Sequence, residues 1–176
     1  MNLLDLDDQT RKLMVEEINL DISSEKLYLS DRLTPTGAGK WREVLLSAVE
    51  SADIGWLVDQ INNLNLLRKQ TPRKTKTGAT MVKVPSNASQ TLAEGEFNRY
   101  YIRAVCRRAI EAGQDVFVYR AKSVNKPRPQ SESLIGKSFD PETLLNDLRE
   151  SIGFDAAMGL PPGPNSCLTA GLKPYS

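Results

Sequence analysis

Two apolar stripes joined by a short link limit the folds open to this chain more than any other feature of its sequence. The first stripe lies in residues 41–49 and has the spacing of one helix face: Trp41, Val44, Leu45, Ala48 and Val49. The second lies in residues 54–64 and repeats this spacing after Asp53, a residue suited to capping a helix. Because only about three residues join the stripes, the two helices are predicted to pack as an antiparallel hairpin.

The other periodic segments predict three more helices and two short strands. Helical spacing predicts these helices: residues 8–19, a segment from within 86–95 to Ala112, and residues 141–152. Gly113 suits a left-handed helix end, and Asp140 suits a helix cap. Alternation of side chains between two faces predicts a strand over residues 80–85. Enrichment in Val, Phe and Tyr predicts a second strand over residues 115–124.

Segments rich in Gly, Pro, Ser or Lys separate the predicted elements. We expect loops over residues 33–40 and 125–133, and an exposed arm over residues 68–80, which contain no large apolar side chain. Residues 20–30 predict a turn followed by a brief strand or extended piece. The Pro- and Gly-rich residues 154–176 are predicted to form no regular structure, being either disordered or an extended arm on a neighbouring surface.

These elements together predict an α+β fold. It combines a helical hairpin with a small sheet packed on a longer helix, and it carries a basic arm and an irregular C-terminal tail. The predicted organisation has four parts: an N-terminal helical region (1–67), a basic arm or linker (68–80), a small α+β region (81–153) and an extended Pro/Gly-rich tail (154–176).

The formal net charge of +1 conceals a strong segregation of charge along the chain. Residues 1–65 hold six Lys or Arg against twelve Asp or Glu, and residues 138–176 hold two against five. Residues 66–137 hold fifteen against five, an excess of ten cations. This asymmetry predicts either a polyanionic partner for the middle of the chain, or acidic ends that neutralise it within the fold or between subunits.

Eight cations form the candidate binding residues, in a dense cluster on the arm and in a stripe at helical spacing: Arg68, Lys69, Arg73, Lys74, Lys76, Arg99, Arg103 and Arg107. The arm is suited to tracking a phosphate backbone without base stacking, because it contains no aromatic residue. It equally suits the acidic segment of a second copy, or serves only as a solubilising linker. The stripe predicts either a solvated face partly paired with Glu96 and Glu111, or a face that grips phosphate or carboxylate groups.

Composition excludes several classes of enzyme. The chain has no histidine, which removes Ser-His-Asp hydrolases, HNH-type nucleases and every histidine-ligated metal site. Its two cysteines are too few for a four-cysteine zinc site. The segment Gly37-Ala38-Gly39-Lys40 resembles a phosphate-binding loop, but Thr34 replaces the first glycine and Trp41 replaces the hydroxyl residue that holds magnesium.

Two further groupings contain residue types used in catalysis. Ser133 and Lys137 have the spacing of a Ser–Lys dyad but show no sign of a buried lysine. Glu111 and Asp115, with Lys122, could form the acid-and-lysine cluster of a metal nuclease. However, Arg120 occupies the position where such a site has an acid two residues from its lysine. We therefore expect no enzyme activity, no cofactor and no metal.

The predicted function is that of a non-catalytic structural component, which makes protein–protein contacts through extended arms in an oligomer or hetero-assembly; a virus particle is one such setting. The alternatives are a nonspecific nucleic-acid-binding accessory protein that contacts the DNA or RNA backbone, and a metal-dependent nuclease. No apolar run approaches the length of a membrane span, so no membrane partner is expected. A cytoplasmic location, or a virion if the chain is a particle component, is predicted from the lack of a targeting segment and of a disulfide framework.

Overall fold

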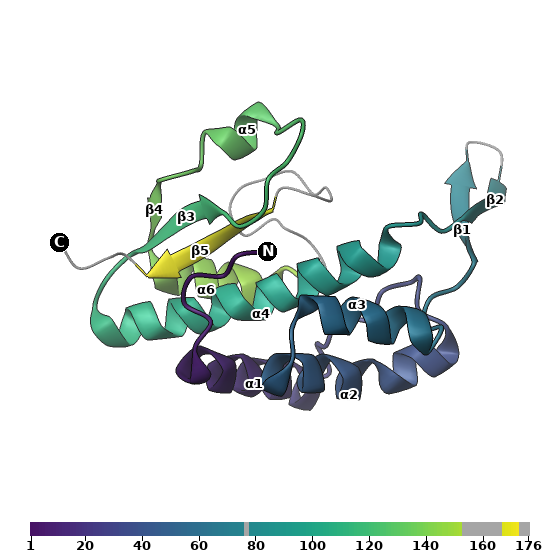
Figure 1. Ribbon diagram of the computed structural model, residues 1–176, viewed down its shortest axis with the longest axis horizontal. Coiled ribbons are helices and arrows are strands. Elements are labelled where there is room, and N and C mark those ends of the chain that lie inside the picture. Colours follow the sequence, from purple (N-terminus) through teal and green to yellow (C-terminus); the bar gives the residue numbers. More distant parts are fainter. Residues whose placement is uncertain (76–77, 153–166, 173–176) are drawn as a thin grey trace. The chain divides into compact units, whose positions relative to one another are not determined.

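The computed structural model describes residues 1–75, 78–152 and 167–172, and over these ranges the chain has an α+β fold (Figure 1). The helices and strands follow one another in this order: α1 (Asp8–Ser23), α2 (Pro35–Ser51), α3 (Ile54–Asn63), β1 (Gln70–Thr75), β2 (Gly78–Lys83), α4 (Ala88–Ala112), β3 (Val116–Arg120), α5 (Pro129–Glu132), β4 (Ser138–Phe139), α6 (Pro141–Glu150) and β5 (Leu168–Leu172). The strands form two antiparallel sheets, one of β1 and β2 and one in the order β4-β3-β5.

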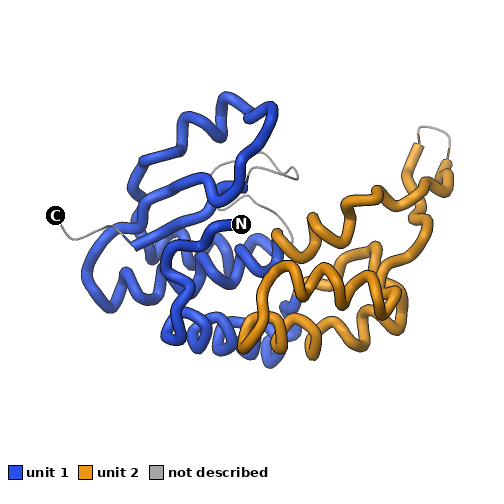
Figure 2. Tube along the Cα trace, in the orientation of Figure 1, with its two compact units in different colours: residues 1–27, 95–176 blue, residues 28–94 orange. Residues whose placement is uncertain are grey.

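The chain divides into two compact units (Figure 2). The first unit contains residues 1–27 and 95–176, and the second contains residues 28–94. The boundary at Gly95 falls inside α4, so this helix contributes to both units. The sequence-based division at other positions stays a prediction.

The second unit is built on the predicted helical hairpin of α2 and α3. All five residues of the first stripe are buried, and Asp53 caps α3 by accepting a hydrogen bond from the Trp56 amide at 2.8 Å. The prediction of a loop over residues 33–40 was wrong, because α2 already begins at Pro35. Thr34 caps that helix through its hydroxyl oxygen, which accepts from the Gly37 amide at 2.9 Å, and a proline is well suited to the first helical turn.

The start of α2 is held against the chain that leaves α3. The Thr34 amide donates to the Leu66 carbonyl at 2.8 Å, and Leu33 pairs with Leu67 in an isolated bridge. A Cβ atom placed on Gly37 would lie only 2.2 Å from the Leu66 oxygen. Glycine is therefore required here by the close approach of two backbone segments.

The arm that follows is a β-hairpin rather than an irregular segment. Strands β1 and β2 pair from Gln70 with Lys83 to Thr75 with Gly78. The strand expected over residues 80–85 corresponds to β2, but the extended partner strand inside residues 68–80 was missed. Its polar composition resembles that of a linker, and its strand conformation depends on pairing with β2.

In the first unit α4 lies between α1 on one side and α6 with the three-stranded sheet on the other (Figure 1). The predicted face of α1 is confirmed: Thr10, Leu13, Met14, Glu17 and Ile18 are all buried. Asp7 caps α1, and, as expected, Asp140 caps α6 and Gly113 follows α4 with φ 63°. Helix α1 extends four residues beyond its predicted end at Asn19, and a turn at Ser24 and Glu25 follows it.

The prediction of an irregular C-terminal tail was wrong for residues 168–172. These residues form β5, which pairs with all of β3 and is almost fully buried. Of the remainder of the predicted tail, Cys167 is described, whereas residues 154–166 and 173–176 lie outside the described residues. Inside the loop expected over 125–133, α5 forms a single short helical turn.

Candidate functional site

The predicted cations fall into two different environments. The stripe of Arg99, Arg103 and Arg107 belongs to α4 in the first unit, whereas the arm cations belong to the β1–β2 hairpin in the second. Arg103 is 1% exposed, while the described hairpin cations are exposed.

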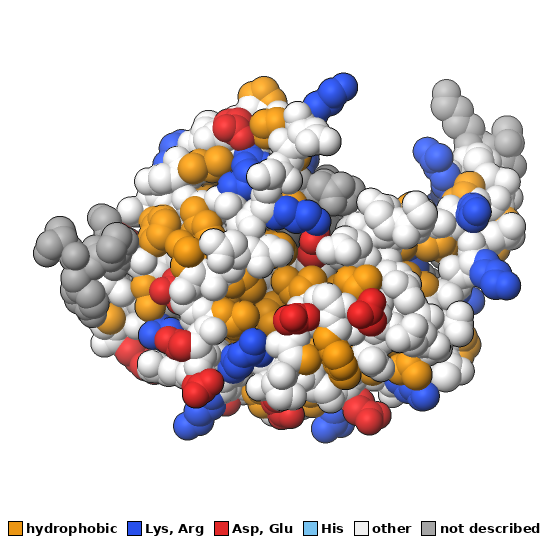
Figure 3. All heavy atoms as spheres, in the orientation of Figure 1, with side chains coloured by type: hydrophobic (Ala, Val, Ile, Leu, Met, Phe, Trp, Pro, Cys, Tyr) orange, Lys and Arg blue, Asp and Glu red, His pale blue; other side chains and the backbone are white. Residues whose placement is uncertain are grey.

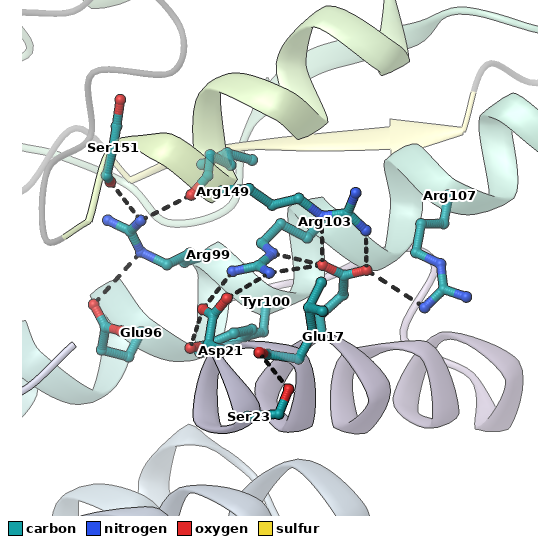
Figure 4. Close-up of polar contacts among 12 residues, drawn as sticks. Glu17, Asp21, Ser23, Glu96, Arg99, Tyr100, Arg103, Arg107, Arg149 and Ser151 are labelled. Carbon is teal, nitrogen blue, oxygen red and sulfur yellow. Dashed lines mark hydrogen bonds and ion pairs between the residues drawn. The ribbon is translucent and has the colours of Figure 1, made fainter. Parts of the chain in front are cut away.

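Arg103 is the centre of a buried ion-pair network between α4 and α1 (Figure 4). Its guanidinium forms a two-point contact with Asp21, with Nη1 2.6 Å from Oδ2 and Nη2 2.9 Å from Oδ1. Its Nε donates to Glu17 Oε2 at 2.8 Å. The Tyr100 hydroxyl donates to Asp21 at 2.9 Å, and the Arg103 guanidinium also lies 5.1 Å from the centre of the Tyr100 ring. Every nitrogen of this guanidinium thus has a partner in its own chain.

Glu17 connects three arginines from two helices (Figure 4). Besides Arg103, it accepts two hydrogen bonds from Arg149 of α6, at 3.0 Å from Nε and 2.6 Å from Nη2. Arg107 lies 3.4 Å from the same carboxylate and 2.8 Å from the more exposed Glu16. The carboxylate of Glu17 is 1% exposed and joins α1, α4 and α6.

The network keeps Glu17 and Arg103 charged although both side chains are buried. Burial acts to raise the pKa of Glu17, but hydrogen bonds and charge from Arg149 and Arg103 outweigh it and hold the pKa below its usual value. Burial likewise acts to lower the pKa of Arg103, and the contacts with Asp21 and Glu17 outweigh it and raise the pKa. These groups are matched to one another rather than poised for proton transfer.

Arg99 is used in the same way, against backbone carbonyls. Its Nη1 donates to the Ser151 oxygen at 2.6 Å and to the Leu148 oxygen at 3.2 Å, at the C-terminal end of α6. Its Nε lies 3.7 Å from Glu96, the partner expected from the sequence. Arg107 differs, because Glu16 and Glu17 take the place of the expected Glu111. The stripe does bind carboxylates, but they belong to its own chain, and Arg103 is not accessible to an external partner.

Asp21 is the residue of this network that sequence reasoning missed. It lies one helical turn after Glu17, on the same face of α1, beyond the predicted end of that helix. Two acids four residues apart on a face that also holds Met14 and Ile18 were the available signal, because acidic residues on an apolar face require cationic partners.

The hairpin of β1 and β2 has a different character. It is a two-stranded sheet, and among the described residues no third strand pairs with either of its edges. All of its described residues are exposed or half-buried, and Met81 is 57% exposed. Arg68, just before the hairpin, is anchored by a 2.9 Å hydrogen bond from its Nε to the Leu33 carbonyl. The other predicted arm residue, Lys76, lies outside the described residues.

Four exposed cations belong to the described hairpin and its base: Lys69, Arg73, Lys74 and Lys83. Lys and Arg side chains gather over β1 and β2 in the space-filling view (Figure 3). Within the described ranges, no carboxylate forms an ion pair with any of the four. Residues 66–93 contain six Lys or Arg and no Asp or Glu at all. The hairpin is consequently a local concentration of uncompensated positive charge.

The candidate Ser–Lys dyad lies on the surface of the first unit. Ser133 is exposed and donates to the Gln130 carbonyl at 2.9 Å, and Lys137 is exposed rather than buried. Over residues 1–75, 78–152 and 167–172, no group of three or more Cys, Asp or Glu side chains has the arrangement needed to hold a metal ion. Burial raises the pKa of the Cys106 thiol to about 12, and the nearby charges of Asp140 and Glu17 add to this effect.

Comparison with known proteins adds no assignment: no protein-family model, curated protein or solved structure matches the chain. Among the helices that the structure describes, none combines the length and apolar composition needed to cross a bilayer.

Proposed function

We propose that this protein is a non-catalytic assembly component that attaches to an anionic macromolecule through the β1–β2 hairpin. The observation that carries the proposal is the exposure of Lys69, Arg73, Lys74 and Lys83 on a hairpin whose neighbouring sequence contains no acidic residue. Surface cations that are not matched within a protein attract negatively charged partners and speed their encounter.

The isolation of the hairpin supports a docking role. A two-stranded sheet on its own is marginally stable in water, because it has little apolar surface to bury. Strands β1 and β2 pair only with each other among the described residues, and the exposed Met81 lies on one of their faces. A partner would cover this surface and fix the conformation of the arm.

The distribution of acids favours an external partner over a second copy of the chain. The acidic N-terminal segment was one candidate for neutralising the basic middle of a neighbouring copy. Four of its carboxylates are already paired with arginines of the first unit: Asp7, Glu16, Glu17 and Asp21. This leaves the second copy a weaker counterpart for the hairpin than an external polyanion. A cytoplasmic or virion location is part of the same proposal.

Retention on immobilised heparin tests the proposal, because heparin is a polyanion that requires no knowledge of the natural partner. The variant Arg73→Gln/Lys74→Gln removes two hairpin charges, and Lys40→Gln/Arg42→Gln removes two exposed charges from α2 of the same unit. We expect the hairpin variant to elute at clearly lower salt than the wild type and the α2 variant to elute close to it. Equal elution of the two variants would contradict the proposal.

A further inference from the structure

We infer that the hairpin's partner is double-stranded nucleic acid, held through its phosphates without selection of sequence. The inference rests on the proposed function and narrows its anionic macromolecule to one class. It follows from where the cations lie on the two faces of the hairpin, and from which side chains accompany them.

The strand register places cations on both faces of the ribbon. Residues paired across antiparallel strands lie on one face, and successive residues alternate between faces. Lys74, which pairs with Ala79, therefore shares a face with Lys83, which pairs with Gln70. Arg73 pairs with Thr80 on the opposite face. Within the paired strands, cations thus lie on both faces of the ribbon.

This arrangement suits a groove better than a flat surface. An acidic protein surface would contact one face of the ribbon and leave the cations of the other face in solvent. The walls of a nucleic-acid groove carry phosphates on both sides, and the major groove of B-form DNA, about 12 Å wide, admits a two-stranded β-ribbon. No described strand pairs with either edge of the hairpin, so no strand of the described chain obstructs its entry into such a groove.

The remaining side chains favour contact with phosphates of a duplex. Threonine hydroxyls, which are common donors to phosphate oxygens, occur on both strands as Thr71, Thr75 and Thr80. Residues 66–93 contain no Phe, Tyr or Trp, so the arm has no platform on which unpaired bases would stack. Duplex binding through the backbone needs no such platform.

Fluorescence anisotropy with a labelled 20-base-pair DNA duplex, measured between 50 and 200 mM salt, tests the inference. Labelled poly-L-glutamate serves as the acidic-polypeptide probe. With four phosphate contacts, the logarithm of the association constant should fall with the logarithm of salt concentration with a slope of about −3.6. Arg73→Gln/Lys74→Gln should reduce the steepness by about 1.8 and weaken binding between about ten- and a hundredfold at 0.1 M salt. Lys40→Gln/Arg42→Gln should change neither quantity appreciably.

The possible outcomes separate this inference from the function on which it rests. Duplex binding that depends on the hairpin variant, and exceeds polyglutamate binding, supports both. Hairpin-dependent binding of polyglutamate without binding of the duplex overturns the nucleic-acid inference and leaves the proposed function standing. If neither probe distinguishes the hairpin variant from the α2 variant, both are overturned. Thermal melting that matches the wild type shows that each variant is folded.

Discussion

Arg103 illustrates how a single residue joins the first unit together. Removing a cation and its carboxylates from water costs several kcal/mol for each ion, and this cost is offset only when the geometry satisfies nearly every donor and acceptor. Glu17 and Asp21 meet that condition for Arg103, with every nitrogen of its guanidinium in contact. Loss of one partner therefore leaves a buried charge unmatched.

Substitution of Glu17 should be among the most destabilising single changes in α1. We expect Glu17→Ala to lower the free energy of unfolding by about 3–5 kcal/mol, since it leaves Arg103 incompletely compensated. Glu16→Ala, on the adjacent exposed position, should cost less than about 1 kcal/mol because it breaks only a surface pair with Arg107. Urea denaturation followed by circular dichroism measures both, and equal losses would contradict the description of the network.

Glu17 also predicts how stability depends on pH. Its pKa in the folded protein lies below the usual value of 4.5, so the folded state binds this proton less readily than the unfolded chain. Its contribution is therefore complete above about pH 4.5 and is lost as the pH falls through the folded pKa. The stability difference between wild type and Glu17→Gln should shrink as the pH is lowered from 7 to 3 in denaturation experiments. A difference that stayed constant over this range would rule out the charged form of Glu17 as its source.

At the scale of elements, sequence was informative where a structure depends on neighbours along the chain. The apolar stripe of α2, the caps at Asp53 and Asp140 and the stop at Gly113 are all local signals, and the structure confirms them. The stripe of α3 is confirmed at Ile54, Leu57 and Ile61, but Leu64 lies beyond the helix and is exposed. The errors concern strands whose conformation depends on distant partners. Strand β5 was hidden in a Pro- and Gly-rich tail because its burial depends on pairing with β3.

The candidate site was likewise predictable only where the signal was local in the sequence. The basic composition of the arm was visible in the sequence, but its pairing into a ribbon with cations on both faces was not. The Arg stripe of α4 was also visible, yet its partners lie on α1 and α6, far away in sequence. One local signal favoured burial of α4 itself. Its own apolar residues, such as Tyr101, Ala104 and Cys106, lie on most sides of the helix, which is typical of a central helix.

The contact between α2 and the chain after α3 predicts that alanine at two glycines of α2 changes the free energy of unfolding in opposite directions. Gly37→Ala should lower the free energy of unfolding by about 1–3 kcal/mol, because its methyl group would collide with the Leu66 carbonyl. Gly39→Ala, with nothing within 4 Å of the new Cβ, should raise it by up to about 1 kcal/mol through better helix propensity. Thermal or urea unfolding of the two variants checks both signs, and stabilisation by Gly37→Ala would show that the contact with Leu66 is absent.

For the whole molecule, the excess of cations in residues 66–137 conceals two populations with different roles. One population, represented by Arg103, is matched by carboxylates and carbonyls inside the first unit and supports the fold. The other, represented by Arg73 and Lys74, is exposed on the hairpin of the second unit. Charge arithmetic along a sequence counts both populations equally, so only the structure separates cations that stabilise from cations available for binding.

The most direct test of this division measures unfolding free energy and heparin retention together in two variants. Arg103→Gln is predicted to lose about 3–5 kcal/mol of stability while its folded form keeps the wild-type elution salt. Arg73→Gln/Lys74→Gln is predicted to keep wild-type stability within about 0.5 kcal/mol while eluting earlier. The reverse pattern, with weaker retention of folded Arg103→Gln and unchanged retention of the hairpin variant, would contradict the assignment of binding to the hairpin and of stability to the network.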